Sequence, residues 1–313
     1  MKNSKITVIR TAVGCPAAAG LIKELKKMGV RVVGTDCNSL SSGFYLCDKS
    51  YVVPKGDNPH FLKEILRICS LEKPKAIISG PEEELLTLSK NKKIFERKNI
   101  LVLVPNYETV KICSDKIATY NFFKKEGIPT PENYKKNDIK FPIIIKPRFG
   151  RGSTNIFKAN NKKELEFYSG KVKNPILQEF INGTEYTVDV FADLEGNPLS
   201  VVPRIRLQIE SGISMKGKTV YEKVIIDLCE KITEKLKIIG PSCIQFIKDR
   251  EGPRFIEINT RFGGGSILSM KADSTIIPNL IRIIKREKPR KSKGFKENLT
   301  MLRYYSEIYT EDL

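Results

Sequence analysis

The first hundred residues of this chain alternate between short apolar runs and amphipathic stretches. The apolar runs, which are typical of strands, are KITVI (5–9), VRVVGTD (30–36) and AIISG (76–80). The amphipathic stretches, in which apolar residues recur at helical spacing, cover residues 17–28, 59–69 and 82–95. Strand patterns that are each followed by a helix pattern are typical of a parallel sheet with crossover helices. The sequence therefore predicts an N-terminal α/β domain over residues 1–113.

A helix and then a second region follow this domain. In SDKIATYNFFKKEG (114–127), Ser114 is a suitable N-cap and Gly127 a suitable end for a linking helix. The prolines of GIPTPENY (127–134) then interrupt regular structure. The second region is expected to be α+β, with helices over 220–236 and 275–285. Its last strand-rich block (240–262) is predicted to be a hairpin whose turn is DREG (249–252).

Length and composition exclude several classes of protein. A chain of 313 residues exceeds the usual single-core size of ~150 residues, so two or three subdomains are expected. No apolar run approaches the ~18 residues of a membrane span, and Arg10 interrupts the apolar part of the N-terminus, so we expect a cytoplasmic protein. The seven cysteines form no CxxC pair, which disfavours a zinc ribbon. The single histidine, His60, disfavours a Ser-His-Asp triad.

The formal net charge of +19 is extreme and raises the question of nucleic-acid binding. Lysine supplies most of this charge and is spread along the chain, whereas arginine is the usual base-reading residue. One segment, residues 282–296, gathers eight basic residues against the single acid Glu287. We favour a solvated helix end and loop over an RNA-binding surface.

The segment FIEINTRFGGG (255–265) combines polar and apolar residues in an unusual way. In a strand, side chains alternate between faces, so Glu257, Asn259 and Arg261 are predicted to share one face. On the partner strand, Gln245 lies between Ile244 and Phe246. One carboxylate and two amide oxygens suit Mg²⁺ rather than Zn²⁺, and an adjacent arginine would neutralise phosphoryl charge. An ordinary exposed strand face is the alternative, which the apolar flanks and the glycines disfavour.

Two further segments supply what a nucleotide site needs. KPRFGRGST (146–154) ends a strand with Lys146 and continues into a basic, glycine-containing loop whose backbone N–H groups would wrap phosphates. LQEFINGTEYTVDV (177–190) places Glu179 at a strand end and then Glu185 on one face of the next strand, where its carboxylate would accept from ribose hydroxyls.

KPRFGRGST, LQEFINGTEYTVD, IQF and FIEINTRFGGG, in this order, resemble the motifs of the ATP-grasp superfamily. The branch with the greatest resemblance is that of short proteins similar to half of a carbamoyl-phosphate synthase large subunit. The resemblance implies a Rossmann-like pre-ATP-grasp domain (1–113) and an ATP-grasp domain (114–313). The latter would comprise a small lid subdomain with the linking helix (114–184) and a C-terminal catalytic subdomain (185–313).

The same resemblance implies a role for each candidate residue. The ATP phosphates would contact Lys116, Lys146, Arg148, Gly152 and Ser153. Adenine would lie against Glu179, Phe180 and the backbone of Ile181, with Glu185 on the ribose. The ligands of Mg²⁺, or of Mn²⁺ in its place, would be Gln245, Glu257 and Asn259. Arg261 would stabilise the acyl phosphate; Arg204, Arg206 and Lys216 would bind the carboxylate or the intermediate, with Lys218 a weaker candidate.

The implied function is that of an ADP-forming ligase that joins a small carboxylate to an amine or a thiol through an acyl phosphate. The loops after Val13 and Ser79 are expected to help bind these substrates. One alternative is a carbamoyl-phosphate synthase-like half unit that activates bicarbonate or carbamate. Another, of a different class, is a non-catalytic protein that binds a nucleotide or nucleic acid. A homodimer is left open.

Overall fold

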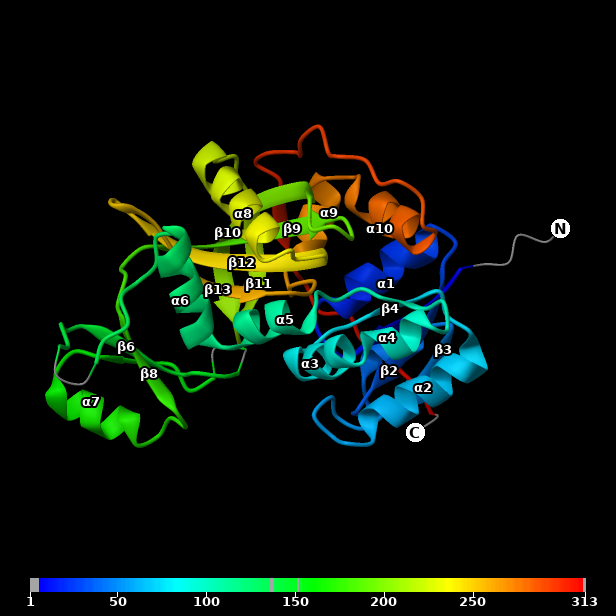
Figure 1. The fold of residues 1–313 in the computed structure, drawn as a ribbon, viewed down its shortest axis with the longest axis horizontal. Helices are drawn as coiled ribbons and strands as arrows, with labels where there is room; N and C mark the ends of the chain where they lie inside the picture. The colour runs from blue at the N-terminus through cyan, green and yellow to red at the C-terminus, as the bar shows by residue number, and fades with distance from the viewer. Residues whose placement is uncertain (1–5, 136–137, 151, 153, 312–313) are drawn as a thin grey trace.

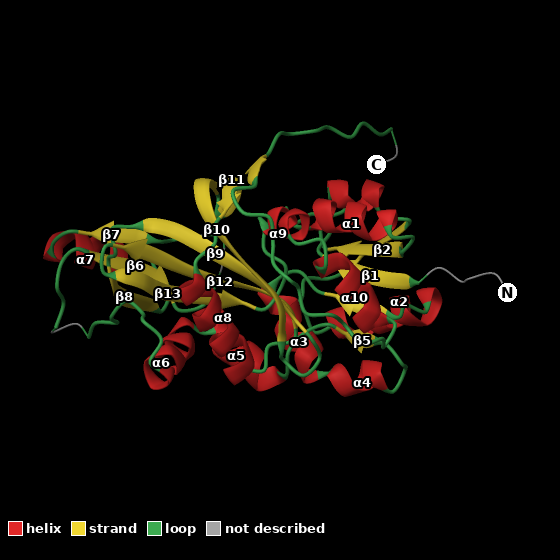
Figure 2. Ribbon diagram, turned by 90° about the horizontal axis from the view of Figure 1, so that it is seen from above, coloured by secondary structure: helices red, strands yellow, loops and turns green. Residues whose placement is uncertain are grey.

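The computed structural model describes residues 6–135, 138–150, 152 and 154–311. Three sheets and the helices around them make up the chain (Figures 1 and 2). None of the helices within the described residues is both long enough and apolar enough to cross a membrane.

The N-terminal part is built on a parallel five-stranded sheet with strand order β3-β2-β1-β4-β5. Its strands are β1 (Thr7–Thr11), β2 (Arg31–Asp36), β3 (Lys49–Val52), β4 (Ala76–Ile78) and β5 (Leu101–Val102). Its helices are α1 (Ala18–Lys27), the 3₁₀ helix η1 (Ser42–Leu46), α2 (Phe61–Glu72), α3 (Glu82–Lys90) and α4 (Lys92–Glu96). The predicted parallel sheet is therefore present, but the single helix expected over 82–95 is wrong, because Asn91 leaves the helical conformation and separates α3 from α4.

Helices cover both faces of this sheet. Val8 and Val32 pack with α1 in one cluster of buried residues, whereas their neighbours Ile9 and Val33 pack with α2 and α3 in another. Alternate residues of a strand face opposite sides, and burial on both sides explains why these strands are almost continuously apolar.

Two helices, α5 (Tyr107–Ser114) and α6 (Lys116–Glu126), connect this part to the rest of the chain. The expectation that Ser114 caps the linking helix is wrong. Ser114 is the last residue of α5, and the Asp115 side chain accepts the Ile117 N–H at 3.0 Å as the N-cap of α6. Gly127 ends α6 with φ +66°, as the sequence predicted.

The second part contains two antiparallel sheets (Figure 1). The small one, of order β7-β6-β8, comprises β6 (Ile143–Pro147), β7 (Phe157–Ala159) and β8 (Pro175–Glu179), with α7 (Lys162–Ser169). The large one, of order β13-β12-β9-β10-β11-β14, comprises β9 (Thr184–Ala192), β10 (Pro198–Glu210), β11 (Ile213–Thr219), β12 (Gly240–Asp249), β13 (Gly252–Asn259) and β14 (Thr300–Leu302). The remaining helices are α8 (Lys223–Lys235), α9 (Ser266–Ala272) and α10 (Ile276–Ile284).

The two parts share a buried core. One apolar cluster contains Leu21 and Leu25 of α1, Phe191 of β9, and Leu280 and Ile284 of α10. This packing fixes the N-terminal part against the six-stranded sheet, and a cavity lies between the two.

Candidate active site

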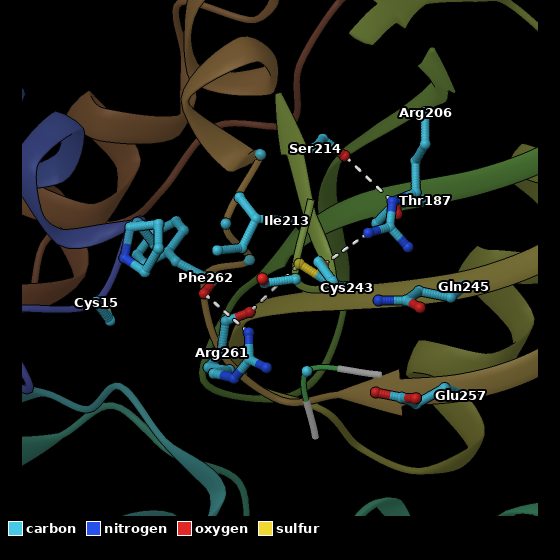
Figure 3. A pocket seen from close by; sticks show the side chains of 18 of the residues that line it. Cys15, Thr187, Arg206, Ile213, Ser214, Cys243, Gln245, Glu257, Arg261 and Phe262 are labelled. Atoms are coloured by element: carbon cyan, nitrogen blue, oxygen red, sulfur yellow. Dashed lines mark hydrogen bonds between the residues drawn. The ribbon is translucent and has the colours of Figure 1, made fainter. Parts of the chain in front are cut away.

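A cavity of about 500 Å³ lies between the N-terminal part and the six-stranded sheet (Figure 3). The loops after β1 and β4 line one side with Cys15, Pro16, Ala17, Gly80 and Pro81. The sheet and its turns line the rest with Thr187, Arg204, Arg206, Ile213, Ser214, Cys243, Gln245, Glu257, Arg261 and the glycines of 263–265, among others. Both loops that the sequence analysis assigned to substrate binding therefore reach this cavity.

The three metal candidates lie on one hairpin. Gln245 of β12 and Glu257 of β13 are directly opposite each other in the antiparallel pair, and both side chains point into the cavity in Figure 3. Asn259 is buried and donates from Nδ2 to Glu257 Oε1 at 2.6 Å. No group of three or more His, Cys, Asp or Glu side chains gathers as a metal site within the described residues. Mg²⁺ is a hard cation that carboxylate and amide oxygens coordinate, so it fits this set of side chains.

A bulge in β13 explains how Glu257 faces the cavity. The pairing shifts between Gln245–Glu257 and Phe246–Phe255, so Ile256 is an extra residue. Strict alternation would put Phe255 and Glu257 on the same face, yet Phe255 is fully buried in the core. Because the bulge resets the alternation, Phe255 and Ile258 both enter the core while Glu257 stays at the cavity.

Arg261 joins the hairpin to the N-terminal part. Its Nη2 lies 3.1 Å from Asn259 Oδ1 and 3.0 Å from Glu82 Oε1, and its Nε donates to the same Glu82 oxygen at 3.1 Å. Glu82 is the first residue of α3. The guanidinium therefore lies at the cavity, held by Asn259 of β13 and by Glu82 of the N-terminal part.

The two phosphate candidates Lys146 and Lys116 interact electrostatically with each other, and Lys146 also with Glu257. Lys146 is the fourth residue of β6 and is only 6% exposed. Burial lowers its pKa from 10.5 to about 8, while the Glu257 carboxylate opposes this shift. Lys116 Nζ donates to the Gly150 carbonyl at 2.8 Å. Lys146 is therefore near enough to Glu257 and Lys116 to interact with both, although neither lysine lines the cavity.

The loop after β6 is described only in part. Arg148, expected at the phosphates, pairs with Asp115 through two hydrogen bonds of 2.8 and 2.5 Å. Gly152 lines the cavity. Ser153 lies outside the described residues.

The adenine and ribose candidates lie away from the cavity lining. Glu179, at the end of β8, accepts the Glu132 N–H at 3.0 Å and donates its own N–H to the Glu132 carbonyl at 2.8 Å. The Phe180 ring lies 4.0 Å below Lys158 Nζ, and Ile181 is buried. Glu185 forms an ion pair with Arg206. Arg206 therefore engages the Glu185 carboxylate, which the sequence analysis assigned to the ribose.

Asp189 is buried and lies at the centre of a network of polar side chains. It pairs with Arg204 Nε at 2.7 Å and accepts from Ser266 and Ser269 at 2.8 and 2.6 Å. Burial would raise the pKa of Asp189, but Arg204 and these donors hold it below its ordinary range. Arg204 and Arg206 both donate to Ser214 Oγ, at 3.0 and 3.2 Å, so the two guanidinium groups are fixed side by side.

Lys216, in contrast, is not brought to this site. It is exposed on β11, pairs in the sheet with Gln208 and Leu302, and is absent from the cavity lining. The sequence analysis assigned no role to Thr187 or Cys243, which also line the cavity. Each lies two residues from a candidate on the same strand, Glu185 on β9 and Gln245 on β12, and this spacing could have identified them. The sequence analysis also missed Arg303, whose Nη2 donates to the Gly264 carbonyl and for which no local signal exists.

The sequence matches an ATP-grasp domain over residues 113–265 and a PylC-like N-terminal domain over residues 13–103. The chain therefore contains an ATP-grasp domain. Its predicted fold class, an N-terminal α/β domain followed by an ATP-grasp domain, is confirmed, and ligases that activate carboxylates with ATP are its relatives.

Two curated relatives illustrate the similarity of this ATP-grasp protein. A carbamoyl-phosphate synthase from Methanobrevibacter smithii is 26% identical over 267 residues, which cover 78% of this chain and 71% of that protein. A D-alanine–D-alanine ligase from Fusobacterium nucleatum is 30% identical over 165 residues, covering 49% and 58%. Against a carbamoyl phosphate synthase large chain from Clostridium botulinum, the chain spans only 27% of the relative's length.

Solved structures share the fold at low identity. The biotin carboxylase domain of Hydrogenobacter thermophilus 2-oxoglutarate carboxylase, solved with MgADP and bicarbonate, has a TM-score of 0.75 at 18% identity and covers 95% of this ATP-grasp chain and 74% of its own. An L-amino acid ligase from Bacillus licheniformis has a TM-score of 0.68 at 18% identity, covering 91% and 75%.

Proposed function

We propose that this ATP-grasp protein is an ADP-forming ligase that activates a small carboxylate with ATP and transfers the acyl group to an amine or a thiol. The observation that carries the proposal is the pairing of Gln245 with Glu257 across the hairpin, at a cavity that Arg261 also lines. Oxygen donors and a fixed guanidinium at one cavity are what phosphoryl transfer to a carboxylate requires. The division into domains 1–113 and 114–313 is part of the proposal.

In the first step, a carboxylate oxygen would bond to the γ-phosphorus of ATP while the bond from the γ-phosphorus to the bridging oxygen breaks and ADP leaves. In the second step, the amine or thiol would attack the acyl carbon, the bond to the phosphate oxygen would break, and the nucleophile would lose its proton. Neither step needs a protein nucleophile. Positioning and charge neutralisation therefore account for the protein's contribution.

Each candidate side chain has a place in this scheme. Glu257, Gln245 and Asn259 would hold Mg²⁺ or Mn²⁺, which supplies neutralising charge to the phosphates when it is bound. Lys146 and Lys116 would neutralise the phosphates from the lid side. Arg261, which contacts Asn259 and Glu82, would stabilise the transferred phosphoryl group. The paired guanidinium groups of Arg204 and Arg206 would orient the substrate.

Glu257→Gln tests the centre of this proposal. The change keeps the shape of the side chain but removes its charge, so we expect ADP release to fall by at least about 100-fold while adenine affinity and thermal stability are retained. The matched control is Glu251→Gln, in the exposed turn of the same hairpin, which should leave activity unchanged. Wild-type activity in the Glu257 variant would remove the basis of the assignment.

The substrate class is tested by ADP release from the wild-type protein. ATP and Mg²⁺ would be combined with a panel of L-amino acids and amines, and separately with bicarbonate and ammonia. Turnover only with bicarbonate and ammonia would favour the carbamoyl-phosphate synthase-like alternative. Salt-resistant binding of nucleic acid together with no turnover in any mixture would favour the non-catalytic alternative.

A further inference from the structure

Residues 286–303, named here the C-terminal strap, return across the six-stranded sheet after α10. Three hydrogen bonds fix the strap: the Ser292 N–H donates to the Leu199 carbonyl at 2.7 Å, the Lys296 N–H to the Ala272 carbonyl at 2.9 Å, and Thr219 Oγ1 to the Lys296 carbonyl at 2.7 Å. The strap then adds β14 to the sheet beside β11. It lies outside the ATP-grasp match, which ends at residue 265.

The strap places Arg303 behind the cavity lining, against two segments that line the cavity. The Arg303 N–H donates to the Met215 carbonyl at 3.1 Å, which continues the pairing with β11. Its Nη2 donates to the Gly264 carbonyl, and its Nη1 lies 3.5 Å from the Pro16 carbonyl. Gly264 and Pro16 both line the cavity, one in the glycine turn after β13 and one in the loop after β1. One guanidinium therefore joins these two lining segments.

Arg303 differs in its charge balance from the three arginines that line this cavity. Arg204, Arg206 and Arg261 each form an ion pair with a carboxylate. Within the described part of the chain, no ion pair to Arg303 is formed, and its buried Nε has no hydrogen-bond partner. Burial, together with the nearby charge of Arg204, lowers the pKa of Arg303. This end of the cavity thus carries uncompensated positive charge, which favours an anionic ligand.

We propose that Arg303 is a positioning residue for the carboxylate substrate, holding the Gly264 turn against the loop after β1 and giving this end of the cavity its preference for an anion. The inference rests on the proposed function, because it assigns the substrate end of the same cavity. Gln245 and Glu257, which Figure 3 labels, line the same cavity as Gly264. A substrate carboxylate that enters beside Gly264 would lie between Arg303 and the metal candidates.

The test compares Arg303→Met, which removes the charge and the donors, with Arg303→Lys, which keeps the charge. Lys293→Met, an exposed cation in the same strap, is the matched control. Steady-state ADP release would be measured with bicarbonate and with each L-amino acid as the carboxylate. For Arg303→Met, we expect the KM for the carboxylate to rise about tenfold or more while the KM for ATP changes less than about twofold. Arg303→Lys should recover part of this loss.

Hydrogen exchange supplies a readout that does not depend on turnover. In Arg303→Met, the amides of residues 263–265 should exchange about tenfold faster, whereas those of β12 should be unchanged. Equal shifts in both KM values, or unchanged exchange at 263–265, would overturn the proposal. If the wild-type protein releases no ADP with any carboxylate, the proposed function fails and the carboxylate role of Arg303 fails with it. The exchange data would still decide whether Arg303 holds the turn.

Discussion

At the scale of single residues, Lys146 shows how a binding function conflicts with stability. Its pKa is 10.5 in an exposed lysine and about 8 in the folded protein, because burial disfavours the ammonium. Between pH 8 and 10.5, the unfolded chain therefore keeps a proton that the folded chain has released. The unfolded state binds more protons in this window, so the free energy of unfolding should rise with pH there.

Lys146→Met should consequently stabilise the protein when no nucleotide is present. We expect a gain of about 3 kcal/mol in the free energy of unfolding at pH 7, where the wild-type lysine is buried with its charge. ATP should bind at least about tenfold more weakly, since the proposed phosphate contact of Lys146 would be lost. Urea denaturation and titration calorimetry measure the two effects, with the exposed Lys162→Met as the control. Lower stability with unchanged ATP affinity would contradict the phosphate role.

At the scale of elements, the start of α6 depends on Asp115. Its carboxylate caps the helix through the Ile117 N–H and forms two hydrogen bonds with Arg148. Asp115→Ala should lower the free energy of unfolding by about 1–2 kcal/mol, because a cap and an ion pair are lost together. Urea denaturation measures this change. Ser114→Ala, one residue earlier, is the control and should lower the free energy of unfolding by less than about 0.5 kcal/mol. A larger loss for Ser114→Ala than for Asp115→Ala would mean that Ser114 caps the helix.

The pH dependence of this contribution follows from the pKa of Asp115. Burial opposes ionisation, but the Arg148 hydrogen bond and the Ile117 N–H lower the pKa below 3.8. The stabilisation by Asp115 should therefore be complete above the unfolded-state pKa and be lost as the pH falls through the folded-state pKa. The difference between wild type and Asp115→Ala should disappear in that acidic range.

Local patterns in the sequence predicted several elements but not their details. The alternation of strand and helix patterns placed β1, β2 and β4 with their helices, and the DREG turn placed the hairpin of β12 and β13. The bulge at Ile256 could not be predicted, since it depends on pairing with β12. The position of β14 in the sheet could not be predicted from local patterns either, because its partner β11 lies about eighty residues earlier in the chain.

At the scale of the whole molecule, the cavity is completed by both parts of the chain, and the ion pair of Arg261 with Glu82 connects them. Sequence patterns predicted the candidates Gln245, Glu257 and Arg261 individually. They could not predict that Arg303 contacts the Gly264 turn, or that Lys216 is exposed on β11, because both depend on how distant strands are arranged.

Glu82→Ala tests this connection. Without its carboxylate partner, Arg261 should lose its fixed orientation, and we expect kcat to fall about tenfold while the KM for ATP stays within about twofold. The control is Glu96→Ala, an exposed acid on α4 of the same domain. Steady-state ADP release measures both variants. Equal activity in the two would mean that the N-terminal domain does not orient Arg261.

At the cavity, Gly152 lies against Gly212, which is in the turn between β10 and β11. A Cβ atom at position 212 would lie 2.9 Å from the Gly152 backbone, and Gly212 also has φ +76°. Two chain segments that meet without side chains can approach as closely as backbone atoms allow. A single methyl group at position 212 would therefore push the two segments apart. A series of larger side chains there would give a graded set of proteins that differ in the access of solvent to the cavity.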